Sequence, residues 1–141
     1  MKKSFILLAI IAVAFSFTMS SCSKESTTLT TLHGTWMLTS ELDASGLPVL
    51  PAVGCTTEEL ITFFLCKDND QGDCEGTQKY TLNCTGFLVP TISTSSFSYR
   101  VFEKSQLVWS GTYYEIESIS KKELKIHRAS TPKATLTFGK Q

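Results

Sequence analysis

The chain has 141 residues, 42% of them hydrophobic, and its 13 basic side chains balance 13 acidic ones. This length and apolar content suffice for one domain with a hydrophobic core, and leave no room for several domains. Nucleic-acid-binding domains carry a basic face, so the neutral balance argues against nucleic acid as a partner.

The N-terminus has the pattern of a bacterial lipoprotein signal peptide. Two lysines precede an apolar run over residues 5–17, which is shorter than the ~20 residues of a membrane-spanning helix. The motif Met-Ser-Ser-Cys at 19–22 then resembles a lipobox, at which a signal peptidase cuts before a lipid-carrying cysteine. We therefore predict a signal peptide over 1–21 and attachment of diacylglycerol and palmitate at Cys22. Ordinary secretory cleavage, with Cys22 as a free thiol, is the alternative.

The residues after this cysteine indicate where the protein resides. Ser23 occupies the position at which lipoproteins retained in the inner membrane carry Asp, so we expect a lipid anchor in the outer membrane. The sequence leaves open whether the domain faces the periplasm or the medium. Segment 22–31 is rich in Ser and Thr and predicts a flexible tether, after which residues 32–141 form the folded domain.

The domain begins with a strand in which Gly34 and Trp36 share one face. A glycine two residues before a tryptophan lets the large ring lie against backbone at the base of a barrel. Further strands are expected over 60–66 and 79–85, and then around 97–101, 107–109, 114–116, 124–126 and 134–138. A helical turn over 56–59, begun by a capping box, is an alternative to strand at that point.

The turns between these later strands are short, which favours antiparallel neighbours in chain order. About eight strands of this kind predict an all-β fold, a small closed up-and-down barrel or a sandwich. We expect the domain to be monomeric.

The two ends of the domain resemble a known group. Leu-x-Gly-Thr-Trp-x-Leu at 32–38 resembles the Gly-x-Trp strand of lipocalins. Residues 114–124 followed by 135–138 resemble the closing strands of the lipocalin-like domain of Bacteroidetes lipoproteins. The resemblance implies a lipocalin-like barrel, in which a basic side chain late in the chain packs over the tryptophan; Arg128 and Lys140 are the candidates. It implies a fold more than an activity.

Four further cysteines allow three disulfide pairings. We favour nested bridges, Cys55 with Cys84 and Cys66 with Cys74, because both would then join one antiparallel hairpin, with a bulge to absorb a mismatch of one residue. A metal site is the alternative, but no Cys-x-x-Cys pair is present and exported chains are oxidised. We therefore predict no metal site and no cofactor.

The same pairing has a consequence for the second strand. It predicts that Leu60 and Phe64 lie on the face of Tyr80, and that Ile61 and Phe63 line the opposite face. Both faces of this strand would then be apolar.

Aromatic side chains dominate the positions that alternation turns inward. They either fill the core or line a pocket for a ligand; they are Trp36, Tyr80, Phe97, Tyr99, Trp109, Tyr114 and Phe138. No nucleophile–base arrangement is indicated, so we predict a protein that is not an enzyme. Two functions follow: binding of a small hydrophobic ligand, or a protein-interaction or inhibitor module of the cell envelope with a filled core and an apolar surface around 47–53 or 87–89.

Overall fold

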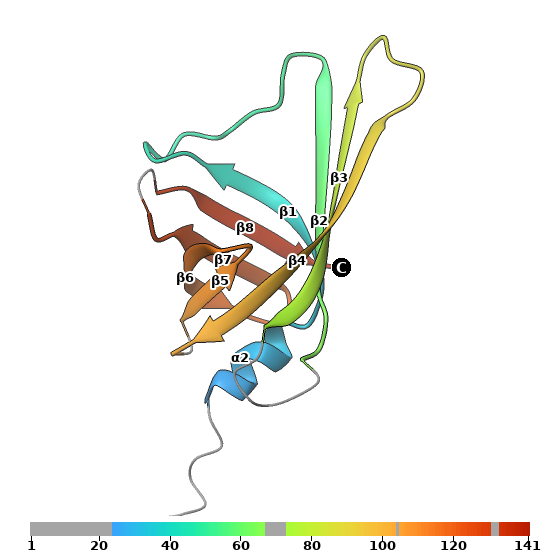
Figure 1. The fold of residues 1–141 in the computed structure, drawn as a ribbon. Coiled ribbons are helices and arrows are strands. Elements are labelled where there is room, and N and C mark those ends of the chain that lie inside the picture. Colours follow the sequence, from blue (N-terminus) through green and yellow to red (C-terminus); the bar gives the residue numbers. More distant parts are fainter. Residues whose placement is uncertain (1–23, 67–72, 104, 131–132) are drawn as a thin grey trace, which may run out of the picture.

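The structure is a computed structural model that describes residues 24–66, 73–103, 105–130 and 133–141. The predicted signal peptide and its Cys22 lipid site lie outside the described residues. Eight antiparallel strands follow one another around a closed barrel, and the last pairs with the first (Figure 1). The prediction of an all-β, up-and-down barrel is confirmed.

One helix precedes the eight strands, and the described elements have the following bounds: α2 (Lys24–Leu32), β1 (Gly34–Leu42), β2 (Cys55–Phe63), β3 (Cys74–Cys84), β4 (Thr91–Phe102), β5 (Gln106–Trp109), β6 (Thr112–Ile119), β7 (Glu123–Arg128) and β8 (Thr135–Lys140).

The core lies inside the barrel and follows the alternation seen in the sequence. In the parts of the strands that enclose the core, alternate residues are buried, such as Phe97 and Tyr99 on β4 and Leu124 and Ile126 on β7, as expected when one face of a sheet packs on itself. The buried hydrophobic residues are Leu32, Trp36, Ile61, Phe63, Cys74, Phe97, Tyr99, Leu107, Trp109, Leu124, Ile126 and Phe138.

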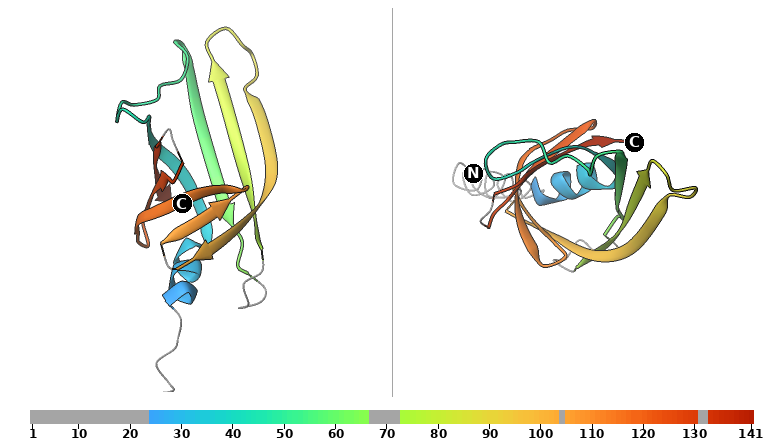
Figure 2. Two further views of the ribbon diagram at one scale, coloured as in Figure 1. Left: turned by 60° about the vertical axis from the view of Figure 1, so that its left-hand side comes forward. Right: turned by 90° about the horizontal axis from the view of Figure 1, so that it is seen from above.

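Helix α2 closes the lower end of the barrel and corrects one expectation. Residues 24–31 were predicted to belong to a flexible tether, but they are helical. Leu32 is fully buried, Thr28 is buried, and Leu29 packs against the core. Seen from above, α2 lies within the outline of the barrel (Figure 2, right). The folded domain therefore includes this helix.

Strands β2, β3 and β4 are longer than the barrel needs. β1 pairs with β2 only from Gly34–Phe63 to Met37–Leu60, and β5 pairs with β4 only over residues 99–102. The upper parts of the three long strands therefore continue the same sheet above the barrel, as a three-stranded part that we call the extension (Figure 1). The extension comprises residues 55–59, 80–84 and 91–96.

The two predicted disulfides are both present. Cys55 is bonded to Cys84 and Cys66 to Cys74, with Cα–Cα distances of 3.9 and 5.1 Å. The first joins directly opposite residues at the upper end of the β2–β3 hairpin, and the second joins its lower end. The nested pairing is confirmed, and the two bridges hold the hairpin at both ends.

The predicted limits and register of the second strand were wrong. The strand spans Cys55–Phe63 rather than 60–66, and no helical turn interrupts it. Ile61 and Phe63 are the inward residues, because odd-numbered positions share the face of Cys55. The β2–β3 ladder also has no bulge, since the chain leaves the ladder after Phe63 and absorbs the mismatch there.

Candidate functional site

The closed end of the barrel is built around Trp36. Its ring is fully buried, and its indole Nε1 donates a hydrogen bond to the carbonyl of Leu32 at 2.7 Å. Gly34 has a φ of 123°, and a Cβ at this position would lie 2.9 Å from Cε of Lys140. The glycine is therefore required both by its backbone conformation and by the side chain that passes over it.

That side chain belongs to β8 and also binds the end of α2. The ammonium group of Lys140 lies 4.9 Å from the centre of the Trp36 ring. It donates hydrogen bonds to the carbonyls of His33, at 2.7 Å, and Thr31, at 3.1 Å. A cation at the carboxyl end of a helix satisfies unpaired carbonyls and interacts favourably with the helix dipole. Of the two candidates for the side chain over the tryptophan, Lys140 occupies this position and Arg128 does not.

Most of the aromatic residues predicted to line a pocket pack on one another in the lower half of the barrel. Phe97 and Trp109 have ring centres 5.4 Å apart, and Trp109 lies 6.4 Å from Phe138. Phe63 makes edge contacts with Phe97 at 5.5 Å and with Tyr99 at 4.9 Å. These rings fill space between the strands, as expected for a small barrel.

The buried hydroxyl of Tyr99 also finds a partner at the edge of this cluster. It donates a hydrogen bond to the carbonyl of Phe64, just beyond the end of β2. Burial raises the pKa of Tyr99 to about 12. The neutral phenol is therefore the form that the folded barrel favours.

A cleft of about 230 Å³ opens at the other end, at the mouth of the barrel. The loop over 43–54 runs from the end of β1 to the upper end of β2 (Figure 1). Residues of this loop form one wall of the cleft, and residues of β1, β2 and β3 form the rest. Of the predicted aromatic residues, Tyr80 lies here rather than in the core, with 36% of its surface exposed. The lining residues are Leu38, Glu41, Val49, Leu50, Pro51, Thr57, Glu59 and Tyr80.

Two glutamates give this mouth cleft its polar character. Glu59 lies directly opposite Tyr80 in the β2–β3 ladder, and its Oε1 accepts a hydrogen bond from Nε2 of Gln78 at 2.8 Å. Burial raises the pKa of Glu59, the hydrogen bond from Gln78 lowers it, and the charge of Glu41 raises it. The net shift is upward, so the site disfavours a second uncompensated negative charge.

A tyrosine on β6 lies close enough to these carboxylates to sense their charge, and an arginine on β7 pairs with it. Tyr114 and Arg128 face each other across β6 and β7, and the Tyr114 ring lies 5.6 Å from that of Trp109. Burial raises the pKa of Tyr114, the charge and hydrogen bond of Arg128 lower it, and the charges of Glu59 and Glu41 raise it. The net shift is upward. Arg128 therefore interacts with Tyr114, and it is not one of the residues that line the cleft.

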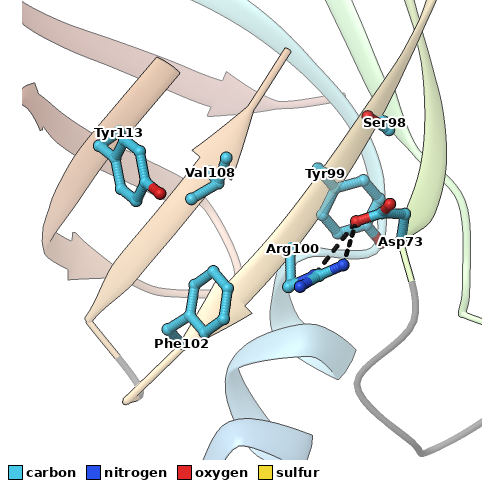
Figure 3. Close-up of a pocket in the computed structure, with 7 residues that line it drawn as sticks. All are labelled: Asp73, Ser98, Tyr99, Arg100, Phe102, Val108 and Tyr113. Atoms are coloured by element: carbon cyan, nitrogen blue, oxygen red, sulfur yellow. Dashed lines mark hydrogen bonds and ion pairs between the residues drawn. The ribbon is translucent and has the colours of Figure 1, made fainter. Parts of the chain in front are cut away.

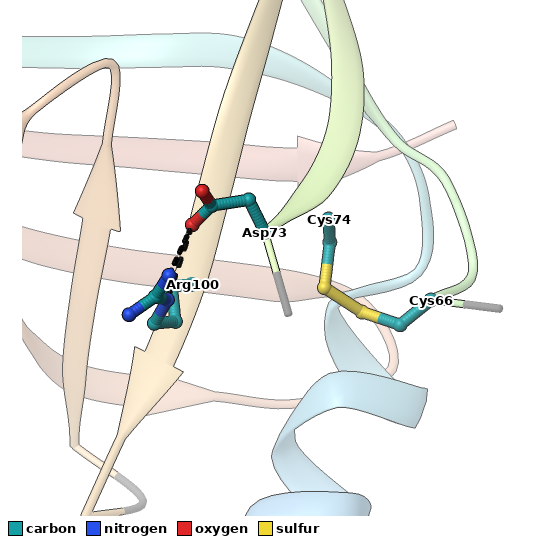
Figure 4. Close-up of polar contacts among 4 residues, drawn as sticks. All are labelled: Cys66, Asp73, Cys74 and Arg100. Carbon is teal, nitrogen blue, oxygen red and sulfur yellow. Dashed lines mark hydrogen bonds and ion pairs between the residues drawn. A yellow bond between two sulfur atoms is a disulfide. The ribbon is translucent and has the colours of Figure 1, made fainter. Parts of the chain in front are cut away.

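A smaller groove of about 130 Å³ lies on the outer face of β4 and β5 (Figure 3). Arg100 crosses it and binds Asp73 at 2.7 Å, while its guanidinium lies 5.5 Å from the Phe102 ring. Figure 4 shows this ion pair close to the Cys66–Cys74 bridge. The Arg100 side chain is 38% exposed and that of Asp73 is 63% exposed, and the two charges are already paired, so neither is free to bind a charged ligand in this groove.

Among the residues that the structure describes, no group of three or more His, Cys, Asp or Glu side chains could hold a metal ion. Within the same residues, no helix has the length and apolar character needed to cross a membrane.

The sequence did not point to the acidic residues of the mouth. Glu59 belongs to the inward face of β2, together with Cys55 and Ile61. An acidic residue on the inward face of a strand can indicate a binding site. The predicted register was wrong, however, and placed Leu60 rather than Glu59 on the face of Tyr80. The inward position of Glu41 could not be predicted for a different reason. The β1–β8 pairing has an irregularity between Leu38 and Ser40, and this irregularity changes the alternation of the strand before Glu41.

Comparison with protein-family models, with curated proteins and with solved structures finds no match for this chain. The candidate binding site is therefore inferred from the mouth cleft alone. This cleft combines an apolar wall with two carboxylates at the open end of the barrel.

Proposed function

We propose that this chain is a non-catalytic binding protein of the bacterial outer membrane, anchored by lipid at Cys22, and that it holds a small, largely apolar ligand at the mouth of its barrel. It would belong among the lipocalin-like lipoproteins of Bacteroidetes, which its two terminal motifs resemble. The observation that supports binding is the cleft of about 230 Å³ between the 43–54 loop and the inner faces of three strands.

The wall of the mouth cleft presents apolar surface that the protein itself does not cover. Val49 is 50% exposed and Leu50 is 79% exposed, although both line a concave site. Covering such surface contributes roughly 25 cal/mol for each Å² removed from water. A ligand with an apolar body would supply that cover, as is typical of small-molecule sites.

The position of the anchor is consistent with this use. Cys22 stands two residues before the start of α2 at Lys24, and α2 closes the end of the barrel opposite the mouth (Figure 1). A lipid at Cys22 would therefore hold the closed end near the membrane and direct the mouth away from it. Ligands would then enter from the aqueous side.

Two tryptophan variants test binding at the mouth. Thr56 and Thr57 are both exposed residues of β2, but only Thr57 lines the cleft. The full-length chain, made in a bacterium and extracted in mild detergent, is expected to show a bound small molecule in native mass spectra. Thr57→Trp should remove that mass and Thr56→Trp should keep it. Retention of the mass in Thr57→Trp, or its absence from the unaltered chain, would contradict the proposal.

The anchor is tested separately. Mass determination of the mature protein should show an N-terminal cysteine that carries acyl chains, and Cys22→Ala should shift the protein out of the membrane fraction. An unmodified Cys22 in the mature chain would contradict lipid attachment while leaving the binding proposal open to its own test.

A second candidate function, a protein-interaction module of the envelope, is favoured by one other observation. The turn after β3 exposes Phe87, Leu88 and Val89, and Val53 is also exposed, two residues before the start of β2. The connection between β3 and β4 and the start of β2 lie at the end of the extension far from α2 (Figure 1). A photocrosslinking residue at Leu88 should capture one defined envelope protein, and the same residue at the exposed Lys121 should not. Equal capture at both positions would contradict this function.

A further inference from the structure

The mouth cleft carries acidic side chains in addition to its apolar wall. Glu41 on β1 and Glu59 on β2 both line it, and none of the described residues that line it is basic. Gln78 donates to only one oxygen of Glu59, and no described residue donates to the other. This oxygen remains available to a donor that enters the cleft.

We propose that the ligand of the mouth cleft is an organic cation, an amine on an apolar body. Its ammonium group would contact Glu41 and Glu59, while its apolar part packs against Leu38, Val49 and Leu50. This inference rests on the proposed function and adds the charge and chemical class of the ligand.

The lining distinguishes a cation from the two other kinds of polar group that an apolar ligand commonly carries. A carboxylate would stand beside two acidic side chains in a partly desolvated site, where like charges repel strongly. An alcohol could donate one hydrogen bond, but it would leave the carboxylates partly removed from water without a counter-charge. An ammonium group supplies both the donors and the charge.

Tyr80 favours the same class of ligand. Tyr80 is 36% exposed as a residue, belongs to the lining of the cleft and lies directly across the ladder from Glu59. The face of an aromatic ring attracts a cation within about 6 Å of its centre. The cleft therefore offers an amine two carboxylates and an aromatic face.

Three six-carbon probes test the charge of the ligand: hexylamine, hexanol and hexanoate. The full-length lipidated chain is placed in lipid nanodiscs, and binding is measured by equilibrium dialysis, with empty nanodiscs to correct for partition into lipid. Hexylamine should bind at least about tenfold more tightly than the other two probes, as expected when a charge-assisted hydrogen bond replaces a neutral one.

Matched variants then locate the site. Glu59→Gln keeps the size of the side chain and should weaken hexylamine binding about tenfold, with hexanol binding unchanged. Glu41→Gln should weaken hexylamine binding in the same direction. Glu58→Gln removes the same charge from the exposed outer face of β2 and should leave hexylamine binding unchanged. Thermal unfolding of each variant identifies any change that arises from loss of the fold.

The outcomes separate this inference from the proposed function. If hexanol or hexanoate binds as tightly as hexylamine, or if Glu59→Gln and Glu58→Gln bind hexylamine equally, the cationic ligand is excluded and a binding site for an uncharged or anionic ligand remains. If none of the three probes binds, this inference is overturned; if, in addition, native mass spectra of the unaltered chain show no bound molecule, the proposed function falls with it.

Discussion

The ammonium group of Lys140, one residue from the end of the chain, lies 4.9 Å from the centre of the Trp36 ring near the start of the domain. The same group binds the carbonyls of Thr31 and His33, so it joins β8, β1 and the end of α2. This one side chain therefore links the closure of the barrel to the docking of the helix beneath it.

We expect Lys140→Met to destabilise the protein by about 1–3 kcal/mol, because it keeps the aliphatic chain but loses the contact with the ring and two hydrogen bonds. Urea unfolding of the full-length chain measures the loss. Hydrogen exchange should also increase in α2. The exposed Lys121 provides the control, since Lys121→Met should change the free energy of unfolding by less than about 0.5 kcal/mol. Equal stability of the two variants would show that the Lys140 contacts contribute nothing.

A second prediction concerns Gly76 on β3. A Cβ at this position would lie 2.4 Å from Cζ of Phe97 and 2.6 Å from the backbone oxygen of Thr62. The Phe97 ring is held by its neighbours, and a backbone atom cannot rotate away, so Gly76→Ala should cost about 1–3 kcal/mol through overpacking. Gly139→Ala is the matched control, because its nearest contact would be an ordinary one of 3.4 Å to Thr39. A Gly76→Ala variant as stable as Gly139→Ala in urea unfolding would contradict this packing.

Much of the barrel could be predicted because its alternation is local. In β4, Phe97 and Tyr99 alternate with small or polar residues, and the structure buries both. The spacing of the cysteines was also sufficient for the pairing, since an antiparallel hairpin relates its two strands by a fixed sum of positions. These signals need no knowledge of distant contacts.

The parts that could not be predicted depend on contacts far along the chain. The segment 24–32 is rich in threonine, which has low helix propensity, and it becomes helical where Leu29 and Leu32 dock on the barrel and Lys140 binds its last turn. The start of β2 was missed for the opposite reason. Residues 55–59 belong to the extension, where both faces are largely exposed, so the strand lacks the apolar alternation that marks the others.

The mouth cleft could not be predicted without two facts that only the structure supplies, the register of β2 and the position of a loop. Glu59 could be placed inside only once the register of β2 was known, and the wall over 49–51 comes from a loop with no periodic pattern. A proline such as Pro51 excludes a central strand, but it does not indicate the surface on which a loop folds. The candidate site therefore emerged from the three-dimensional arrangement rather than from any motif.

A third prediction compares the two disulfides. Replacing both members of a pair by Ala should destabilise the chain more for Cys55–Cys84 than for Cys66–Cys74, by about 1 kcal/mol, because the sequence separations are 29 and 8 residues. Urea unfolding under oxidising conditions measures both losses. Loss of Cys55–Cys84 should also increase hydrogen exchange in the extension while the core stays protected, since β1 and β5 do not pair with the upper parts of β2 and β4. A larger loss for Cys66–Cys74 would contradict the prediction.

The last prediction concerns the stability of the barrel in alkali. Burial raises the pKa of Tyr99 to about 12, whereas an unfolded tyrosine has a pKa of about 10. The folded state therefore holds the phenolic proton more tightly, and this contribution is complete below about pH 10 and is lost as the pH rises towards about 12, by roughly 1.4 kcal/mol per pH unit. Tyr99→Phe should be less stable at neutral pH by about 1 kcal/mol, because the Phe64 carbonyl loses its donor, yet its stability should fall less steeply in alkali. Tyr113→Phe, at an exposed position, should keep the steep fall, so urea unfolding of both variants across this pH range separates the buried phenol from general alkaline effects. Equal steepness in the two variants would show that the Tyr99 proton does not contribute to folding.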